Sequence, residues 1–327
     1  MTAPRRLLAI GLAAPLLLVA CTTDGGDDSG GGGSAQAGGG DGDLVVTVVT
    51  HGSAGDAFWD VVQNGAEAAG EDLGIDVDYQ SDGDPQRQAQ LIDAAVNQGV
   101  DGIVVSMANP DAIQESVEAA VAAGIPVVTI NSGGDRSVEF GAIGHVGQDE
   151  AIAGEGAGRE LAADGASNVL CVIHEAGNIG LEQRCAGAST GLGAEVRPLQ
   201  VDINDLTGAQ STITSQLQSD PAIDAVLTLN SAVAAVAVQS LADAGSDAAV
   251  ATFDLNQDVI SGIQDGSIAF AVDQQQYEQG YLPIVMLQLY AENLNTVGGG
   301  QPVLTGPGIV DATNVDEIAD LASAGTR

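Results

Sequence analysis

Residues 102–131 read GIVVSMANPDAIQESVEAAVAAGIPVVTIN, and this stretch decides the fold. Its first and last segments are short runs of β-branched residues, which predict strands over 102–106 and 126–131. Between them an Ala-rich segment carries apolar residues at helical spacing and predicts a helix over 111–123. Strand, helix and strand in this order are typical of a βαβ unit, whose two strands pair in parallel.

The same alternation continues in both directions from this unit. Upstream it predicts strands over 44–50 and 75–80 and helices over 57–73 and 85–98. It restarts after Gly147 with strands over 168–173, 195–201, 225–228, 249–253 and 267–272 and with helices over 150–163, 181–192, 208–219, 231–244 and near Val259. Because the part from Leu44 onward is too large for one ordinary core, we predict an α/β fold of two doubly wound parallel-sheet lobes.

The N-terminus has the organisation of an export signal. Arg5 and Arg6 precede an apolar run over 7–20, which is shorter than the roughly 20 apolar residues that span a bilayer. Leu-Val-Ala-Cys at 18–21 resembles a lipobox, which implies that residues 1–20 are removed and that Cys21 becomes a lipidated N-terminus. The alternative is a plain secretory signal. Residues 21–43 are almost entirely Gly, Asp, Ser, Thr, Ala and Gln and predict a flexible linker.

The charge balance excludes several classes of function. The chain has 45 acidic and 8 basic residues and a formal net charge of -37, so a phosphate backbone would be repelled and no nucleic acid is expected. All the basic residues are Arg, which excludes a Walker P-loop, a Schiff-base enzyme and any catalytic Lys. We interpret the acidity as an adaptation to solubility or high salt.

The few cysteines and histidines of the chain indicate a disulfide and no metal site. With Cys21 assigned to lipid, Cys171 and Cys185 remain, and in an oxidising compartment we expect a disulfide between them; two buried thiols are the alternative. His51, His145 and His174 occur singly, without the spacing of a metal motif, so neither a metal nor another cofactor is expected.

Polar and aromatic residues follow the predicted strands, where doubly wound folds bind their ligands. The residues in question are His51, Asp56, Phe58, Trp59, Asn131, Ser132, His174, Glu175, Asn178, Glu182, Asn230, Asp254 and the run DQQQY at 273–277. Amides and carboxylates can bond several hydroxyls, and an aromatic ring can cover the C–H face of a sugar. This set indicates a neutral polyhydroxylated ligand.

The order of several short segments carries a family resemblance. They are the opening strand followed by DAFW at 56–59, GIPVVTIN at 124–131, the segment between the two cysteines, LN at 229–230, FD at 253–254 and DQ at 273–274. From Leu44 to about Asp311 the chain resembles the class I periplasmic binding proteins of the sugar-binding, ribose-binding-like type. The resemblance implies two α/β lobes, 44–147 with 275–306 and 148–274 with 307–327, joined by three hinge strands and closing over a ligand.

The resemblance also implies roles for individual residues. Asp56 matches a polar contact of the first loop, and Phe58 and Trp59 match aromatics that stack on the sugar. Polar contacts of the second lobe and hinge fall at Asn230, Asp254 and Gln274. This chain has Asn131-Ser132 and Glu182 where the family's ribose binders carry basic residues, so we expect Asn131 and Glu182 to contact a different ligand: another pentose, a hexose, a polyol or a cyclitol.

Each of these residues also has a purely structural interpretation. Phe58 and Trp59 can pack in the core, and Asp56 can cap the helix that starts near Ala57. Asn131, Asn230, Asp254 and Gln274 can be turn or hinge residues, and Glu182 can be a solvated helix start. A ligand contact and a cap are not exclusive.

The expected function is therefore that of a lipid-anchored binding protein outside the cytoplasmic membrane. It would capture a sugar or polyol, act as a monomer without catalytic activity, and deliver its ligand to an ABC permease. Two rivals remain. One is a sensor that presents the same closed form to a membrane receptor, and the other is a lipoprotein hydrolase that uses an Asp/Glu pair or Ser189, which lies in a G-x-S-x-G pattern. We attribute that pattern to chance, because Ser189 falls in a predicted helix.

Overall fold

The computed structural model describes residues 44–53 and 55–327. The predicted signal, the lipidation site Cys21 and the linker lie outside these residues. None of the helices in the described part is long and apolar enough to cross a membrane.

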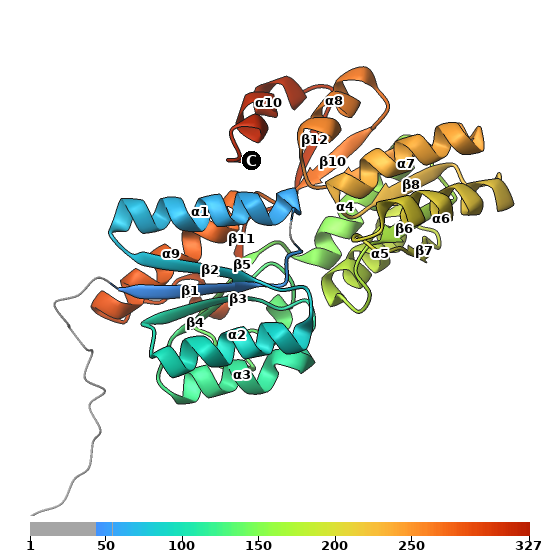
Figure 1. Cartoon of the computed structure of the whole chain (residues 1–327). Coiled ribbons are helices and arrows are strands. Elements are labelled where there is room, and N and C mark those ends of the chain that lie inside the picture. Colours follow the sequence, from blue (N-terminus) through green and yellow to red (C-terminus); the bar gives the residue numbers. More distant parts are fainter. Residues whose placement is uncertain (1–43, 54) are drawn as a thin grey trace, which may run out of the picture. The chain divides into compact units, whose positions relative to one another are not determined.

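The first lobe is built on a six-stranded parallel sheet in the order β11-β5-β4-β3-β1-β2 (Figure 1). Its strands are β1 (Val45–Thr50), β2 (Asp76–Ser81), β3 (Gly102–Ser106), β4 (Val127–Ile130), β5 (Gly144–Gly147) and β11 (Val303–Leu304). Its helices are α1 (Ala57–Leu73), α2 (Pro85–Gln98), α3 (Pro110–Ala122) and α9 (Gln276–Asn293). Helices α1 and α9 cover one face of the sheet, α2 and α3 cover the other, and each face has its own apolar cluster.

The second lobe repeats this plan with strand order β12-β10-β9-β8-β6-β7. Its strands are β6 (Val169–Ile173), β7 (Arg197–Gln200), β8 (Ala225–Thr228), β9 (Ala249–Phe253), β10 (Phe270–Asp273) and β12 (Gly308–Asp311). Its helices are α4 (Glu150–Ala163), α5 (Ile179–Leu192), α6 (Leu206–Ser219), α7 (Ser231–Ala244), α8 (Gln257–Asp265) and α10 (Val315–Ser323). Only β12 is antiparallel to its neighbour among these described strands. The predicted fold class, two parallel-sheet α/β lobes, is confirmed.

The chain passes between the two sheets three times, after β5, after β10 and after β11. The predicted helices and strands agree with the observed ones to within a few residues. The strands β5, β11 and β12 and the helix α10 were not predicted. These strands have only two to four residues, too few to display a periodicity, and their pairing with distant strands defines them.

Helices α4 and α5 touch through their backbones. A Cβ atom added at Gly158 of α4 would overlap the carbonyl oxygen of Ala188 in α5, and one added at Gly187 of α5 would overlap that of Ala151 in α4. Glycine is unfavourable within a helix, so its presence here reflects the need for close approach. Helices α1 and α9 of the first lobe meet in the same way at Gly65 and Gly280.

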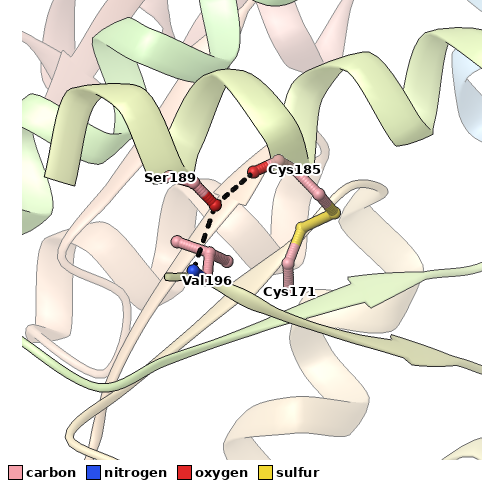
Figure 2. The surroundings of a disulfide bond; sticks show 4 residues. All are labelled: Cys171, Cys185, Ser189 and Val196. Carbon is pink, nitrogen blue, oxygen red and sulfur yellow. Dashed lines mark hydrogen bonds between the residues drawn. A yellow bond between two sulfur atoms is a disulfide. The ribbon is translucent and has the colours of Figure 1, made fainter. Parts of the chain in front are cut away.

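The disulfide joins Cys171 of β6 to Cys185 of α5, as expected (Figure 2). Beside it, the hydroxyl of Ser189 donates a hydrogen bond to the carbonyl of Cys185 at 3.3 Å and accepts one from the amide of Val196 at 3.0 Å. Ser189 therefore lies inside α5 and not on the strand-to-helix turn that a nucleophile elbow requires. The glycines of this pattern, at 187 and 191, serve the contact with α4.

The α4–α5 contact can be tested with a matched pair of substitutions in one helix. Gly158→Ala forces a methyl group against a backbone carbonyl and should lower the free energy of unfolding by about 1–3 kcal/mol. Gly156→Ala, where nothing lies within 4 Å of the added atom, should raise it by up to about 1 kcal/mol through helix propensity. Urea denaturation measures both. Equal effects of the two substitutions would contradict the close-packing explanation.

Candidate functional site

A cleft of about 310 Å³ lies at the carboxyl ends of the strands of both sheets. The first lobe lines it with His51, Asp56, Phe58, Trp59, Asn131 and Ser132. The second lobe and the crossing after β10 line it with His174, Glu175, Asn178, Leu181, Arg184, Leu229, Asn230, Asp254 and Gln274. Part of this space is open to solvent, and the part that water-sized molecules can occupy is about 30 Å³, which is below the range for ligand pockets.

Most of the residues predicted to bind the ligand lie together in this cleft. They are Asp56, Phe58, Trp59, Asn131, Asn230, Asp254 and Gln274. Other residues that the sequence singled out at strand ends join them, namely His51, Ser132, His174, Glu175 and Asn178. Contact between any of these residues and a ligand remains a prediction.

Glu182 is the exception, because its side chain is exposed and lies outside the cleft. It borders a separate hollow beside the disulfide. A basic residue does line the cleft from this helix, namely Arg184, two positions further along α5. Residues two apart on a helix point in different directions, so Glu182 faces outward while Arg184 faces the cleft. A guanidinium therefore lines the cleft from α5, which Glu182 alone did not reveal.

Arg184 is held on several sides in the cleft wall. Its Nε and Nη2 atoms donate to the two carboxylate oxygens of Glu150 at 2.5 and 3.0 Å, and both side chains are 4% exposed. The guanidinium lies over the ring of Phe253, 4.7 Å from its centroid. Nη2 also donates to Oε1 of Gln274 at 3.3 Å. Nη1 makes no hydrogen bond within the described residues, which leaves it available to a ligand.

Two of the polar residues at strand ends have a left-handed backbone conformation. Asn131 follows β4 with φ 61°, and Asp254 follows β9 with φ 69°. Both angles belong to the left-handed region, which Asn and Asp tolerate better than other non-glycine residues. Non-glycine residues held there are common at binding sites, and both of these line the cleft.

Gln274 connects the two lobes at the floor of the cleft. Its amide nitrogen donates to Oδ1 of Asp254 at 2.6 Å, and its oxygen accepts from Nδ2 of Asn131 at 3.3 Å. Asp254 belongs to the second lobe and Asn131 to the first, and Gln274 lies directly after β10, where the chain crosses between them. The three side chains therefore form one buried network across the crossing.

Asp56 caps α1, as considered for it, and also meets a side chain of the other lobe. Its Oδ1 atom accepts the amide of Phe58 at 3.1 Å, which caps α1. Nδ2 of Asn230, from the second lobe, also donates to the two carboxylate oxygens at 3.4 and 3.5 Å. Asn230 in turn caps α7 through the amide of Ala232 at 2.8 Å. Two helix caps thus face each other across the cleft.

The aromatic pair also combines two roles. Phe58 and Trp59 are 5% and 6% exposed and belong to the apolar cluster under α1, yet both line the cleft. Their rings meet edge to face with centroids 4.9 Å apart. The ring of His51 packs against Trp59 with centroids 4.7 Å apart, which holds the indole at the cleft wall.

Comparison with known proteins shows to which family this chain belongs. The family described as periplasmic binding protein domain matches residues 46–295. The chain belongs to this family. A carbohydrate transporter from Acidothermus cellulolyticus 11B, solved in complex with myo-inositol, is 42% identical and has a TM-score of 0.86, covering 88% of this chain and all of its own.

Two curated sequences of this periplasmic binding protein family are more distant. The ribose import binding protein RbsB of Bacillus subtilis is 29% identical over 62% of this chain, and the xylose/arabinose-binding protein XylF of Sulfolobus acidocaldarius is 28% identical over 66%. The matches span 66% and 59% of the lengths of these relatives. An ABC sugar transporter protein from Legionella pneumophila, 24% identical with a TM-score of 0.74, shares the fold.

Burial governs ionisation in the cleft of this periplasmic binding protein. It raises the pKa of Asp56 to about 6 and that of Asp254 to about 7. It lowers the pKa of His174 to about 4 and also lowers the pKa of His51. Burial opposes the charge of Arg184 as well, but the adjoining Glu150 outweighs it and raises the pKa of Arg184. Within the described residues, no cluster of three or more His, Cys, Asp or Glu side chains could hold a metal ion.

The raised pKa of Asp254 predicts a specific dependence of stability on pH. Between its ordinary pKa of 3.8 and the folded value of about 7, the folded protein holds a proton that the unfolded chain has lost. This contribution to stability disappears as the pH rises through 7, because the folded state must then carry a buried carboxylate. Asp254→Asn removes the titration, so its stability relative to wild type should increase from pH 5 to pH 8.

Urea unfolding of the ligand-free proteins at both pH values measures this difference. A relative stability of Asp254→Asn that stays constant or decreases over this interval would contradict the assignment.

Proposed function

We propose that this protein is the solute-binding component of an ABC-type importer and that it captures a neutral sugar, polyol or cyclitol in the cleft between its lobes. One observation carries the proposal. Arg184, Asp254, Asn230 and Gln274 converge on one cleft whose opposite wall holds Trp59. Hydrogen-bond donors and acceptors beside an indole ring match a ligand ring that carries hydroxyls around its rim and C–H bonds on its faces.

The chemistry of the side chains in the cleft narrows the class of possible ligands. Carboxyl oxygens of Asp56 and Asp254 can accept hydrogen bonds from hydroxyl groups, and the free Nη1 of Arg184 can donate one to a hydroxyl oxygen. A carboxylate or phosphate on the ligand would meet these acidic side chains, so a neutral molecule fits better. The 42% identical relative was solved with myo-inositol, which is a neutral cyclitol. Myo-inositol is therefore the first compound to test.

Contacts between the lobes support a closing mechanism. The amide of Ile179 in the second lobe donates to the carbonyl of Ala108 in the first at 3.1 Å, and Oγ of Ser132 donates to Oδ1 of Asn178 at 3.3 Å. A ligand that touches both walls favours the form in which these contacts exist. We propose that the membrane permease recognises that form, and that the moving bodies are residues 44–147 with 275–306 and 148–274 with 307–327.

We also propose that Cys21 anchors the protein by lipid on the outer face of the cytoplasmic membrane. The lipobox-like 18–21 segment supports this, and the Cys171–Cys185 disulfide supports an oxidising compartment. The Gly-rich linker would let a monomeric binding protein move above its permease without diffusing away.

Ligand binding can be tested with the full-length protein. In a thermal-shift screen of pentoses, hexoses, polyols and cyclitols, a neutral compound such as myo-inositol should raise the melting temperature, because it binds only the folded state. Titration calorimetry should then show that Trp59→Ala and Asp254→Ala each weaken binding more than tenfold. Glu182→Ala, outside the cleft, should leave the affinity unchanged.

If both cleft variants lost less than threefold in affinity, the ligand would bind at another place. If no neutral compound in the screen raised the melting temperature, the proposed function itself would be wrong.

Lipidation can be tested separately in a bacterial host supplied with a radiolabelled fatty acid. The wild-type protein should incorporate the label, and Cys21→Ala should not, because lipid attachment needs that thiol. Cys185→Ser, which removes a different cysteine, should still be labelled. An unlabelled wild-type protein would indicate a plain secretory signal.

A further inference from the structure

A second hollow shares three lining residues with the cleft, namely His51, His174 and Glu175. It contains about 1,260 Å³ of space, part of it open to solvent, compared with about 310 Å³ for the cleft. We call the cleft the inner compartment and this hollow the outer compartment. Asn109 and Gln88 of the first lobe and Gln200 of the second also line the outer compartment, so it lies between the lobes as the inner one does.

Two polar residues that line the outer compartment, His174 and Asn109, leave side-chain hydrogen-bonding capacity unused within the described residues. His174 is 6% exposed, and its Nδ1 atom is buried without a partner. Asn109 precedes α3, but its side chain makes no capping bond. Such groups are costly when buried unpaired, and they become favourable when a ligand supplies the missing partner.

The side chains of His51 and Glu175, which line both compartments, are held by several contacts. Nδ1 of His51 is 2.6 Å from Oγ of Ser106, and its Nε2 lies 3.8 Å from Oε2 of Glu175. The same oxygen of Glu175 accepts from Nδ2 of Asn178 at 2.7 Å. A ligand that extended from the inner into the outer compartment would pass beside these groups and could bond them.

The charges of the outer compartment limit which ligands it can bind. Glu175 and Asp202 line it, and no Arg does. Burial lowers the pKa of both His51 and His174, so neither ring offsets the two carboxylates near neutral pH. An anionic group such as a phosphate or a uronic acid would be repelled, whereas hydroxyl groups can donate to the carboxylates and bond the amides.

We infer that the outer compartment is a second sugar subsite, so that the preferred ligand is a neutral glycoside with one ring in each compartment. This rests on the proposed function, because the inner compartment must hold the first ring. Ala108 borders the outer compartment, and its carbonyl forms the backbone hydrogen bond to Ile179 of the other lobe. A second ring would therefore lie against both lobes and add to the contacts that favour closure.

The test compares single rings with their glycosides on the full-length protein. The probes are myo-inositol with its galactoside galactinol, D-glucose with maltose, and D-xylose with xylobiose, each measured by titration calorimetry. At least one glycoside should bind at least tenfold more tightly than its single ring. Gln200→Ala and Asn109→Ala should each weaken the glycoside at least threefold and leave the single ring within twofold.

Gln218→Ala, an exposed substitution on α6, serves as the matched control and should change neither affinity. If single rings bind and depend on Trp59 while no glycoside binds more tightly, the second subsite is overturned and the proposed function stands. If variants at 109 and 200 weaken both probes equally, the outer compartment is not a separate subsite. If no probe of either kind binds, both proposals fall.

Discussion

The buried ion pair between Arg184 and Glu150 is the interaction on which the rest of the cleft depends. Removing a guanidinium and a carboxylate from water is costly, and the cost is offset only when their hydrogen bonds are made with good geometry. Both Glu150 oxygens meet Arg184, which requires α4 to lie against α5 without intervening side chains. Glycines at that contact provide the closeness, and the disulfide beside Arg184 ties α5 to β6. A chain with a formal charge of -37 thereby keeps a cation in its binding wall.

The first lobe repeats the packing but not the chemistry. Its helices α1 and α9 also meet through glycines, at Gly65 and Gly280, yet α1 brings an acid cap and two aromatic rings to the cleft instead of an arginine. One wall thus contributes an apolar surface and Asp56, and the other contributes Arg184, Asp254 and amides. Since neither wall alone surrounds a polyhydroxylated ring, the proposed binding of such a ring would be coupled to the approach of the two lobes.

The parts of the site that could be predicted are those tied to strand ends. In a parallel sheet the carboxyl ends share one edge, so residues such as Asn131, Asn230 and Asp254 could be grouped without coordinates. Residues inside helices were harder. Glu182 and Arg184 are two positions apart on α5, and nothing in their spacing says which of them faces inward. The pairing of Arg184 with Glu150, 34 residues earlier, would have been the useful signal, but it exists only once α4 and α5 are packed.

The amino-acid sequence by itself determined the alternation of strands and helices, and it indicated a disulfide between Cys171 and Cys185 with two buried thiols as the alternative. These follow from composition and from local periodicity, which do not depend on distant contacts. Only the tertiary structure decided the strand order with its late return through β11 and β12, the place of Arg184 in the cleft and the existence of an outer compartment. Such features arise where residues far apart in the chain meet, and their energies depend on burial and distance, which no stretch of sequence contains.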